Sequence, residues 1–167
     1  MSIFYVFYVK DKLVGDCLDL IKLTCNPSTS TRVHVTVRGP YPKVKKEKLK
    51  WRDFRPPHIQ INGVSNFFPE EQSTVFLKCS FEGQKEIWRK TDYPDGIGHA
   101  TLYDGKSRSF AERLFSIFCK YPWHFKVRTG ELEPLIVNKR KGERQFGLTL
   151  DANGELLVSS VIPAFIC

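Results

Sequence analysis

The sequence predicts an α+β protein with a mainly antiparallel sheet, and three observations support this class. Short segments rich in β-branched and aromatic residues recur along the 167-residue chain. Two longer stretches repeat their apolar residues at helical spacing instead. An Asn-Gly pair near the end separates two strand-like segments, as in a hairpin. The 41% hydrophobic content excludes a disordered chain, and the apolar runs are too short to cross a bilayer.

The first half of the chain supplies four predicted strands and one helix. Ile3–Val9 is aromatic and β-branched throughout, which is typical of a buried strand. Asp11–Cys25 is a predicted helix because its apolar residues recur at i, i+3, i+4 and i+7: Val14, Cys17, Leu18, Ile21 and Cys25. Asn26-Pro27 ends this helix. Further strands are expected at Arg32–Arg38, where polar and apolar residues alternate until Gly39-Pro40, and at His58–Phe68 and Thr74–Ser80.

The second half continues with strands, one clear helix and a hairpin. Ser109 and Glu112 fit a capping box, which predicts a helix that begins there and runs to about Lys120. A weaker pattern at Glu82–Lys90 is consistent with a short helix. The predicted strands are Gly98–Asp104, Trp123–Arg128 and Glu133–Val137, followed by a hairpin of Gln145–Leu150 and Glu155–Ile162 across Asn153-Gly154.

Charge and cysteine content narrow the class of partner and the compartment. The chain has 26 Lys and Arg against 18 Asp and Glu, a net charge of +8, which favours a polyanionic partner such as nucleic acid or nucleotide. The basic run Lys43–Lys50 either steers such a partner or is an ordinary solvated face. The five Cys show no metal-ligand spacing, and no signal peptide is evident, so we expect reduced thiols in a cytoplasmic protein.

Two short motifs, His34-Val35-Thr36 and His99-Ala100-Thr101, lie within predicted strands. Because side chains of a strand alternate between its faces, each His should lie beside its Thr on a polar face. The same alternation places Arg38 beside Thr36, and Tyr103 beside Thr101, while the residues between them point into a core. A single His-x-Thr carries no weight, but a pair in two similar strands is rare by chance.

These residue types suit the cleavage of a phosphodiester. That reaction needs a base for the attacking oxygen and an acid for the leaving oxygen, and two imidazoles can serve both roles near neutral pH. Threonine hydroxyls can donate hydrogen bonds to the non-bridging oxygens of the phosphate. The sequence has no evident carboxylate cluster for Mg²⁺, so we expect no metal and no cofactor.

RVHVTVRGP and GHATLYDG resemble the two signature motifs of the 2H phosphoesterase superfamily, which includes 2′-5′ RNA ligase-like proteins and cyclic phosphodiesterases. The order of elements agrees as well, since an apolar strand and a helix precede the first motif and a helix follows the second. The resemblance covers roughly residues 1–137. It does not include the terminal hairpin.

The resemblance implies a fold, a reaction and a set of substrates. The fold is a bilobal one, with two mainly antiparallel sheets, helices outside and a central cleft. Residues 1–140 would form two pseudo-symmetric lobes, and we expect residues 141–167 to form a hairpin packed on the same domain. His34 and His99 would be the catalytic pair, and Thr36 and Thr101 would hold the phosphate. Substrates in the family include RNA ends and 2′,3′-cyclic, 2′-5′ linked or cyclic oligonucleotides.

Five further residues are candidates for substrate binding, and each has an ordinary structural alternative. Arg38 could contact the phosphate or be a strand-end surface residue, and Tyr103 could stack on a base or pack against the following helix. Tyr5 could reach a base but also fits the core. Tyr41 could line the edge of the cleft, and Arg108 lies near a helix start where anions bind, although loop arginines are usually solvated.

Other functions stay open at this stage. One alternative is a non-catalytic RNA or nucleotide binder with the same fold. Another is an interaction module, because the final segment Val161–Cys167 is unusually apolar and could cover the core or contact a second subunit. The sequence does not determine the substrate linkage, the base preference, the direction of a reversible ligation, or which His is the acid. It does not determine the oligomeric state either, although a monomer is slightly favoured.

Overall fold

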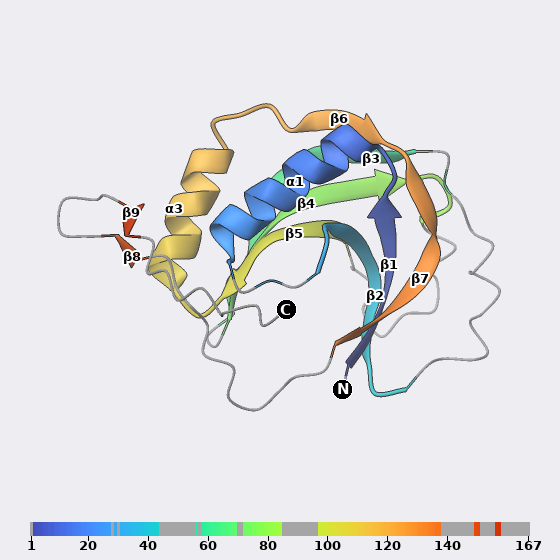
Figure 1. The fold of residues 1–167 in the computed structure, drawn as a ribbon, viewed down its shortest axis with the longest axis horizontal. Coiled ribbons are helices and arrows are strands. Elements are labelled where there is room, and N and C mark those ends of the chain that lie inside the picture. Colours follow the sequence, from blue (N-terminus) through green and yellow to red (C-terminus); the bar gives the residue numbers. More distant parts are fainter. Residues whose placement is uncertain are drawn as a thin grey trace, which may run out of the picture.

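The computed structural model describes residues 2–27, 29, 31–43, 56, 58–69, 72–84, 97–137, 149–150 and 156–157 (Figure 1). Their elements are, in chain order, β1 (Ser2–Val9), α1 (Lys12–Cys25), β2 (His34–Tyr41), β3 (Ile59–Phe67), β4 (Ser73–Phe81), β5 (Gly98–Gly105), α3 (Arg108–Phe118), β6 (His124–Val127), β7 (Thr129–Val137), β8 (Thr149–Leu150) and β9 (Leu156–Leu157). Every strand pair among them is antiparallel. The predicted α+β class is therefore confirmed.

Seven of the described strands form one sheet in the order β6-β3-β4-β5-β2-β1-β7, and β8 pairs separately with β9. The two motif strands, β2 and β5, are neighbours in the middle of this sheet. The expectation of two main sheets with a cleft between them is not confirmed, because β2 and β5 are hydrogen-bonded members of the same sheet.

The sheet curls strongly, because its two edge strands are almost consecutive in the sequence. β6 and β7 lie at opposite ends of the strand order, yet only Arg128 separates them. One residue spans about 3.5 Å, so the two edges must approach each other. Figure 1 shows the chain passing from β6 over the sheet into β7. The Asp11 carboxylate holds this corner by accepting hydrogen bonds from the Arg128 N–H (2.6 Å) and Nε (3.0 Å).

The apolar core lies on one face of the sheet, which we call the helix face. Val33, Val35 and Val37 of the first motif region are at most 2% exposed there, as the alternation predicts. Ala100 and Leu102 of β5 join them, together with Leu18 of α1. A smaller cluster contains residues of both helices, Cys25 of α1 and Ala111 of α3, with Val75 and Tyr103. Both helices therefore cover the face opposite to that of the motif histidines.

Helix α1 is present as predicted, but its buried stripe differs from the predicted one. The buried residues are Gly15, Leu18, Lys22 and Cys25, and Cys17 is exposed. The expectation that Cys17 lies on the apolar stripe is therefore wrong. The true stripe includes a lysine, whose long side chain can be buried only where its ammonium finds partners.

Helix α3 begins two residues earlier than the capping box predicts. Ser107, not Ser109, is the N-cap, and its hydroxyl accepts a hydrogen bond from the Phe110 N–H (3.4 Å). Glu112 pairs with Arg108 across one turn instead of reaching back to a Ser109 cap (2.7 Å). An N-cap hydroxyl needs only the backbone N–H three residues on, which Phe110 supplies, so Ser107 caps the helix without a capping-box glutamate.

Several expectations lie wholly or partly outside the described residues. These are the basic run after Lys43, most of the Glu82–Lys90 helix, and the apolar segment Val161–Cys167. Of the predicted terminal hairpin, the described part is the pairing of Thr149 with Leu157 and of Leu150 with Leu156. Within the described part of the chain, no helix has the length and apolar character needed to cross a membrane.

Candidate functional site

The pairing of β2 with β5 brings both His-x-Thr motifs to one place. Thr36 lies directly opposite His99, and Val35 lies opposite Ala100. The next residues along this antiparallel pair are His34 and Thr101, so each histidine stands across from the threonine of the other motif. Directly opposed side chains share a face and have Cβ atoms about 5 Å apart. The four residues therefore form one cluster on the face opposite the helices, which we call the site face.

A β-bulge follows the threonine in both motif strands. On β2, Thr36 pairs with Val6 and Arg38 pairs with Tyr5, so two steps on β2 match one step on β1. On β5, Thr101 pairs with Phe76 and Tyr103 with Val75, which is the same irregularity. A bulge inserts one extra residue and ends the strict alternation of faces. Arg38 and Tyr103 consequently lie on the helix face, not beside the motif residues as alternation alone predicts.

Arg38 lies in a buried aromatic cluster together with two other predicted binding residues. It is 2% exposed, and its Nε donates a hydrogen bond to the Tyr41 hydroxyl (2.9 Å). Tyr5 and Tyr41 are 4% exposed each and contact each other edge to face (6.2 Å between ring centroids). Gly39 follows with a φ of +119°, and a side chain there would lie 2.7 Å from the Ile3 carbonyl. Burial on the helix face gives these three residues a structural role in this conformation.

Tyr103 and Arg108 contact the α3 region instead of the motif cluster. The Tyr103 ring packs edge to face on Phe110 (5.2 Å), which is the alternative that the sequence left open. Arg108 lies over the Phe68 ring (4.4 Å) and donates a hydrogen bond from Nη1 to the Phe68 carbonyl (2.8 Å). These two contacts connect the first residue of α3 with the residue that follows β3.

Both imidazoles are oriented by the same local hydrogen bond. The Nδ1 atom of His34 is 2.8 Å from the Arg32 carbonyl, and Nδ1 of His99 is 2.8 Å from the Ile97 carbonyl. A carbonyl only accepts, so Nδ1 carries the hydrogen in each ring. The neutral tautomer then has its lone pair on Nε2. Two histidines with the same backbone contact, two residues back, thus present the same nitrogen for proton transfer.

The surroundings lower the pKa of both imidazoles. Burial is the main cause for His34, and the Lys22 ammonium and His99 add to it, so that its pKa falls to about 4. Burial also lowers the pKa of His99, partly offset by its bond to the Ile97 carbonyl and by the Asp104 carboxylate. The charged neighbours act in opposite directions on the two pKa values: at His34 the Lys22 ammonium outweighs the Asp19 carboxylate, whereas at His99 the charge that shifts the pKa is the Asp104 carboxylate.

The site face contains further side chains that the sequence analysis missed. Lys78 of β4 lies directly opposite His99, and Phe76 lies opposite Thr101. Phe67 is 42% exposed and contacts the His99 ring edge-on (5.6 Å). Tyr8 contacts the His34 ring in the same manner (5.9 Å). No local sequence pattern marks these four residues, because their nearness to the motifs follows from the strand order β3-β4-β5-β2-β1.

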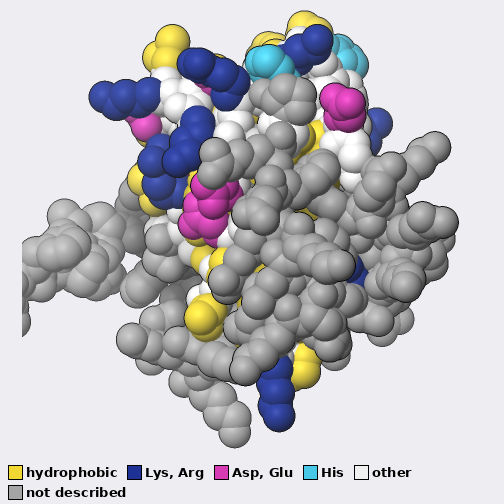
Figure 2. Space-filling model, turned by 90° about the vertical axis from the view of Figure 1, so that its right-hand side faces the viewer, with side chains coloured by type: hydrophobic (Ala, Val, Ile, Leu, Met, Phe, Trp, Pro, Cys, Tyr) yellow, Lys and Arg dark blue, Asp and Glu magenta, His cyan; other side chains and the backbone are white. Residues whose placement is uncertain are grey.

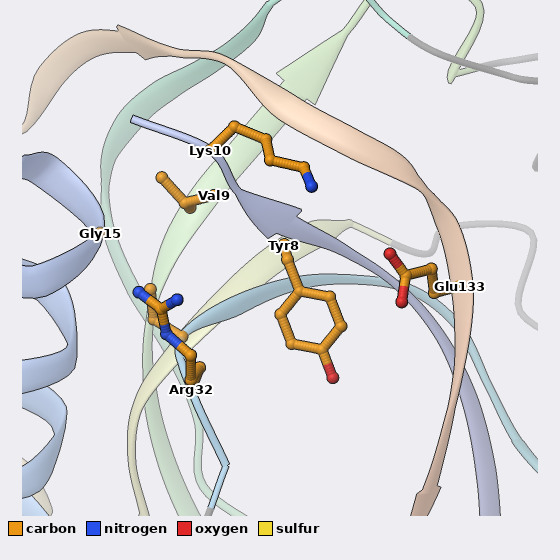
Figure 3. Close-up of a pocket in the computed structure, with 7 residues that line it drawn as sticks. Tyr8, Val9, Lys10, Gly15, Arg32 and Glu133 are labelled. Carbon is orange, nitrogen blue, oxygen red and sulfur yellow. The ribbon is translucent and has the colours of Figure 1, made fainter. Parts of the chain in front are cut away.

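A pocket of about 290 Å³ lies beside His34 (Figure 3). Its lining is Tyr8, Val9, Lys10, Gly15, Arg32, Val33 and Glu133. Arg32 and Val33 directly precede His34, and Tyr8 is its aromatic neighbour, so the pocket borders the motif cluster. It offers two cations, one carboxylate and one phenol around an apolar floor.

Figure 2 shows a side on which the described Lys and Arg side chains gather toward the top, with acidic side chains between them. Among the described residues, no three His, Cys, Asp or Glu side chains are grouped as metal ligands would be. Of the residues that the structure describes, Lys22 and Lys78 bring positive charge close to the motif cluster.

The comparisons with known proteins add no relative. A scan against models of protein families finds no match, and neither does a search of curated proteins.

Proposed function

We propose that this protein is a metal-independent phosphodiesterase of the 2H type, in which His34 and His99 together supply the general acid and the general base. The observation that carries the proposal is the register of β2 and β5, in which Thr36 lies opposite His99. A phosphate held between these side chains would face both Nε2 atoms. The bulge that follows each motif threonine supports the twofold relation between the two halves that the family implies.

Each residue of the cluster has a distinct role in the proposal. One imidazole takes a proton from the attacking oxygen, and the other gives a proton to the leaving oxygen. Thr36 and Thr101 donate hydrogen bonds to the non-bridging oxygens. Lys78 supplies positive charge next to His99, and the exposed ring of Phe67 offers a surface on which a base can stack. The substrate class is RNA or a small 2′,3′-cyclic, 2′-5′ linked or cyclic oligonucleotide.

The cellular setting is part of the same proposal. Cys17, Cys25, Cys79 and Cys119 are free thiols, which suits a reducing compartment such as the cytoplasm.

Turnover of a substrate panel with EDTA present tests this function. The panel should contain 2′,3′-cyclic nucleotides, 2′-5′ and 3′-5′ dinucleotides and cyclic dinucleotides. We expect cleavage of at least one member, and a loss of about 10²–10⁴-fold in kcat for His34→Ala and for His99→Ala. His124→Ala is the matched control, because it removes an exposed histidine on the edge strand β6.

The results of this assay distinguish a phosphodiesterase from a protein that only binds nucleotides. Cleavage that survives both motif substitutions would overturn the assignment of the two histidines. Binding of a nucleotide without turnover by the folded wild-type protein would instead identify a non-catalytic binder.

A further inference from the structure

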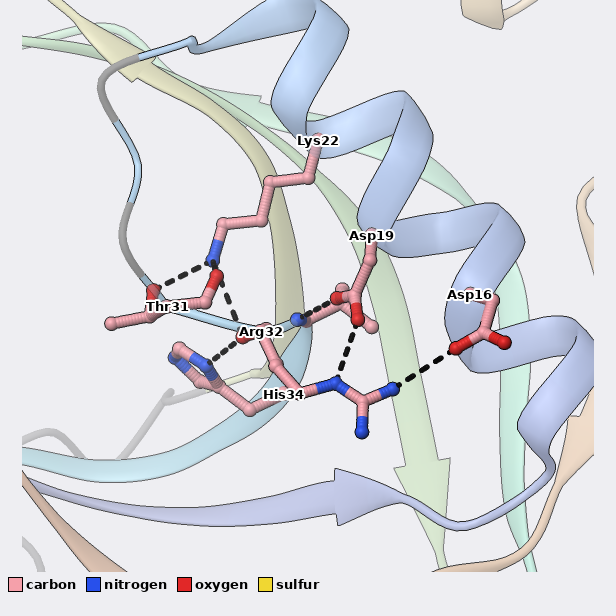
Figure 4. A network of polar contacts seen from close by, with 7 residues as sticks. Asp16, Asp19, Lys22, Thr31, Arg32 and His34 are labelled. Carbon is pink, nitrogen blue, oxygen red and sulfur yellow. Dashed lines mark hydrogen bonds and ion pairs between the residues drawn. The ribbon is translucent and has the colours of Figure 1, made fainter. Parts of the chain in front are cut away.

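Lys22 is a buried lysine on α1 whose ammonium is held at the start of the first motif strand (Figure 4). Its side chain is 5% exposed, which is rare for a lysine. The Nζ atom donates hydrogen bonds to the Thr31 carbonyl (2.9 Å), the Thr31 hydroxyl (2.9 Å) and the Arg32 carbonyl (3.4 Å). None of these partners carries a charge, so the ammonium enters this environment without a directly bonded carboxylate.

The Arg32 carbonyl connects Lys22 with the catalytic candidate His34. This one oxygen accepts a hydrogen bond from Lys22 Nζ and also from Nδ1–H of His34 (2.8 Å). Asp19, three residues before Lys22 on α1, accepts hydrogen bonds from the Val33 N–H and from Nε of Arg32. Lys22 and Asp19 of α1 thus hold residues 31–33 by hydrogen bonds. Because His34 directly follows this segment and donates a hydrogen bond to the Arg32 carbonyl, the segment positions the His34 ring.

Charged groups of both signs lie near His34, but they differ in whether another residue already pairs with them. From α1 it faces Lys22 and Asp19, and the Asp19 carboxylate is already paired with Arg32 (2.8 Å). Among the described residues, further titratable groups on this side are Tyr8 on β1, Glu133 on β7 beyond that tyrosine, and His99 on β5. His99 faces Lys78, which lies directly opposite it on β4, and the Asp104 carboxylate of its own strand, and of these two charges it is Asp104 that shifts the pKa of His99. The two imidazoles therefore differ in the charge that their surroundings present.

We propose that Lys22 is a positioning residue for His34, which orients the imidazole through the shared Arg32 carbonyl and keeps it unprotonated by its positive charge. His34 is then the general base and His99 the general acid of the reaction. Nε2 of His34 takes the proton of a water or ribose hydroxyl as its oxygen forms a bond to phosphorus. The bond from phosphorus to the leaving oxygen breaks, and that oxygen receives the proton from Nε2 of His99, which enters this step as the imidazolium because the neutral ring carries its hydrogen on Nδ1. This assignment rests on the proposed phosphodiesterase function.

Imidazole titration by NMR, without any substrate, tests the coupling itself. Lys22→Met removes the charge and keeps most of the apolar stem, and Lys22→Arg keeps the charge. Lys12→Met is the matched control, because it removes an exposed lysine from the same helix. We expect Lys22→Met to raise the pKa of His34 by about one unit and to change His99 less. Lys22→Arg and Lys12→Met should leave the His34 titration within a few tenths of a unit.

A measurement on the wild-type protein keeps the test valid if Lys22→Met does not fold. Burial lowers the pKa of Lys22 to about 8, so the ring signals of His34 should show a second inflection near that pH. The ring signals of His124 on β6 should show none. Absence of that inflection, or an unmoved His34 in folded Lys22→Met, would overturn the role of Lys22.

The pH dependence of kcat/KM separates this proposal from the proposed function. The acidic limb reports the general base of the free enzyme, so Lys22→Met should move that limb to higher pH by about one unit. If the acidic limb of the kcat/KM profile follows the titration of His99 instead, His99 is the general base and His34 the general acid. If the NMR coupling is present but no substrate is cleaved, the proposed function fails together with that assignment. If cleavage occurs without coupling, only the role of Lys22 fails.

Discussion

Replacing His34 with Gln should reduce the loss of stability that the protein suffers below neutral pH. Burial and the nearby Lys22 ammonium lower the pKa of His34 from 6.5 to about 4. As the pH falls below 6.5, the unfolded chain binds a proton at this residue, whereas the folded chain stays neutral until about pH 4. The folded state is therefore fully stable, with respect to this group, above pH 6.5, and loses stability through the window from 6.5 to about 4.

The size of this effect follows from the two pKa values. One pKa unit corresponds to about 1.4 kcal/mol, so the complete window is equivalent to about 3 kcal/mol. Between pH 7.5 and pH 5 the His34 contribution is about 2 kcal/mol, because the folded imidazole is still largely neutral at the lower limit. His99 acts in the same direction, since burial also lowers its pKa.

Urea denaturation at pH 7.5, 6 and 5 measures the effect on wild type, His34→Gln and His124→Gln. We expect His34→Gln to lose about 2 kcal/mol less than wild type between the two outer pH values. His124→Gln controls for removal of an imidazole elsewhere in the sheet. Equal pH dependence in wild type and His34→Gln would refute the description of His34 as a buried, neutral imidazole.

Three other predictions concern residues whose place the structure has determined. Tyr103→Ala should lower the free energy of unfolding by about 3 kcal/mol because the ring packs on α3, whereas Tyr103→Phe should leave substrate KM unchanged; a raised KM would contradict the packing role. Ala100→Leu should cost about 1–3 kcal/mol in denaturant titrations, because Ala100 is 1% exposed opposite Val35; an unchanged midpoint would speak against this tight packing. Exposed Cys17 and Cys119 should react with a thiol reagent in the native protein, as peptide mass spectrometry would show. Cys25 and Cys79, whose pKa burial raises to about 11 and about 12, should react only after unfolding, and native labelling of Cys79 would contradict its burial.

Local pattern was sufficient for the elements and for part of the site. The alternation in Arg32–Arg38 correctly predicts that Val33, Val35 and Val37 enter the core and that His34 and Thr36 share the other face. These properties depend on the two-residue period of a strand, which neighbouring residues in the sequence display directly. The prediction fails for Arg38 and Tyr103, because each follows a bulge that strand alternation does not reveal.

Sequence pattern predicts individual elements, but it does not show which distant strands pair with each other. The sequence by itself was enough to predict the strands of the seven-stranded sheet, the helices α1 and α3, and the two His-x-Thr pairs as separate units. The tertiary structure decided that β2 and β5 are neighbours, that Thr36 meets His99, and that α1 places Lys22 next to the carbonyl that orients His34. Register between strands 65 residues apart is set by the packing of whole faces. A lysine on a buried stripe finds its partners only when helix and sheet are already in contact.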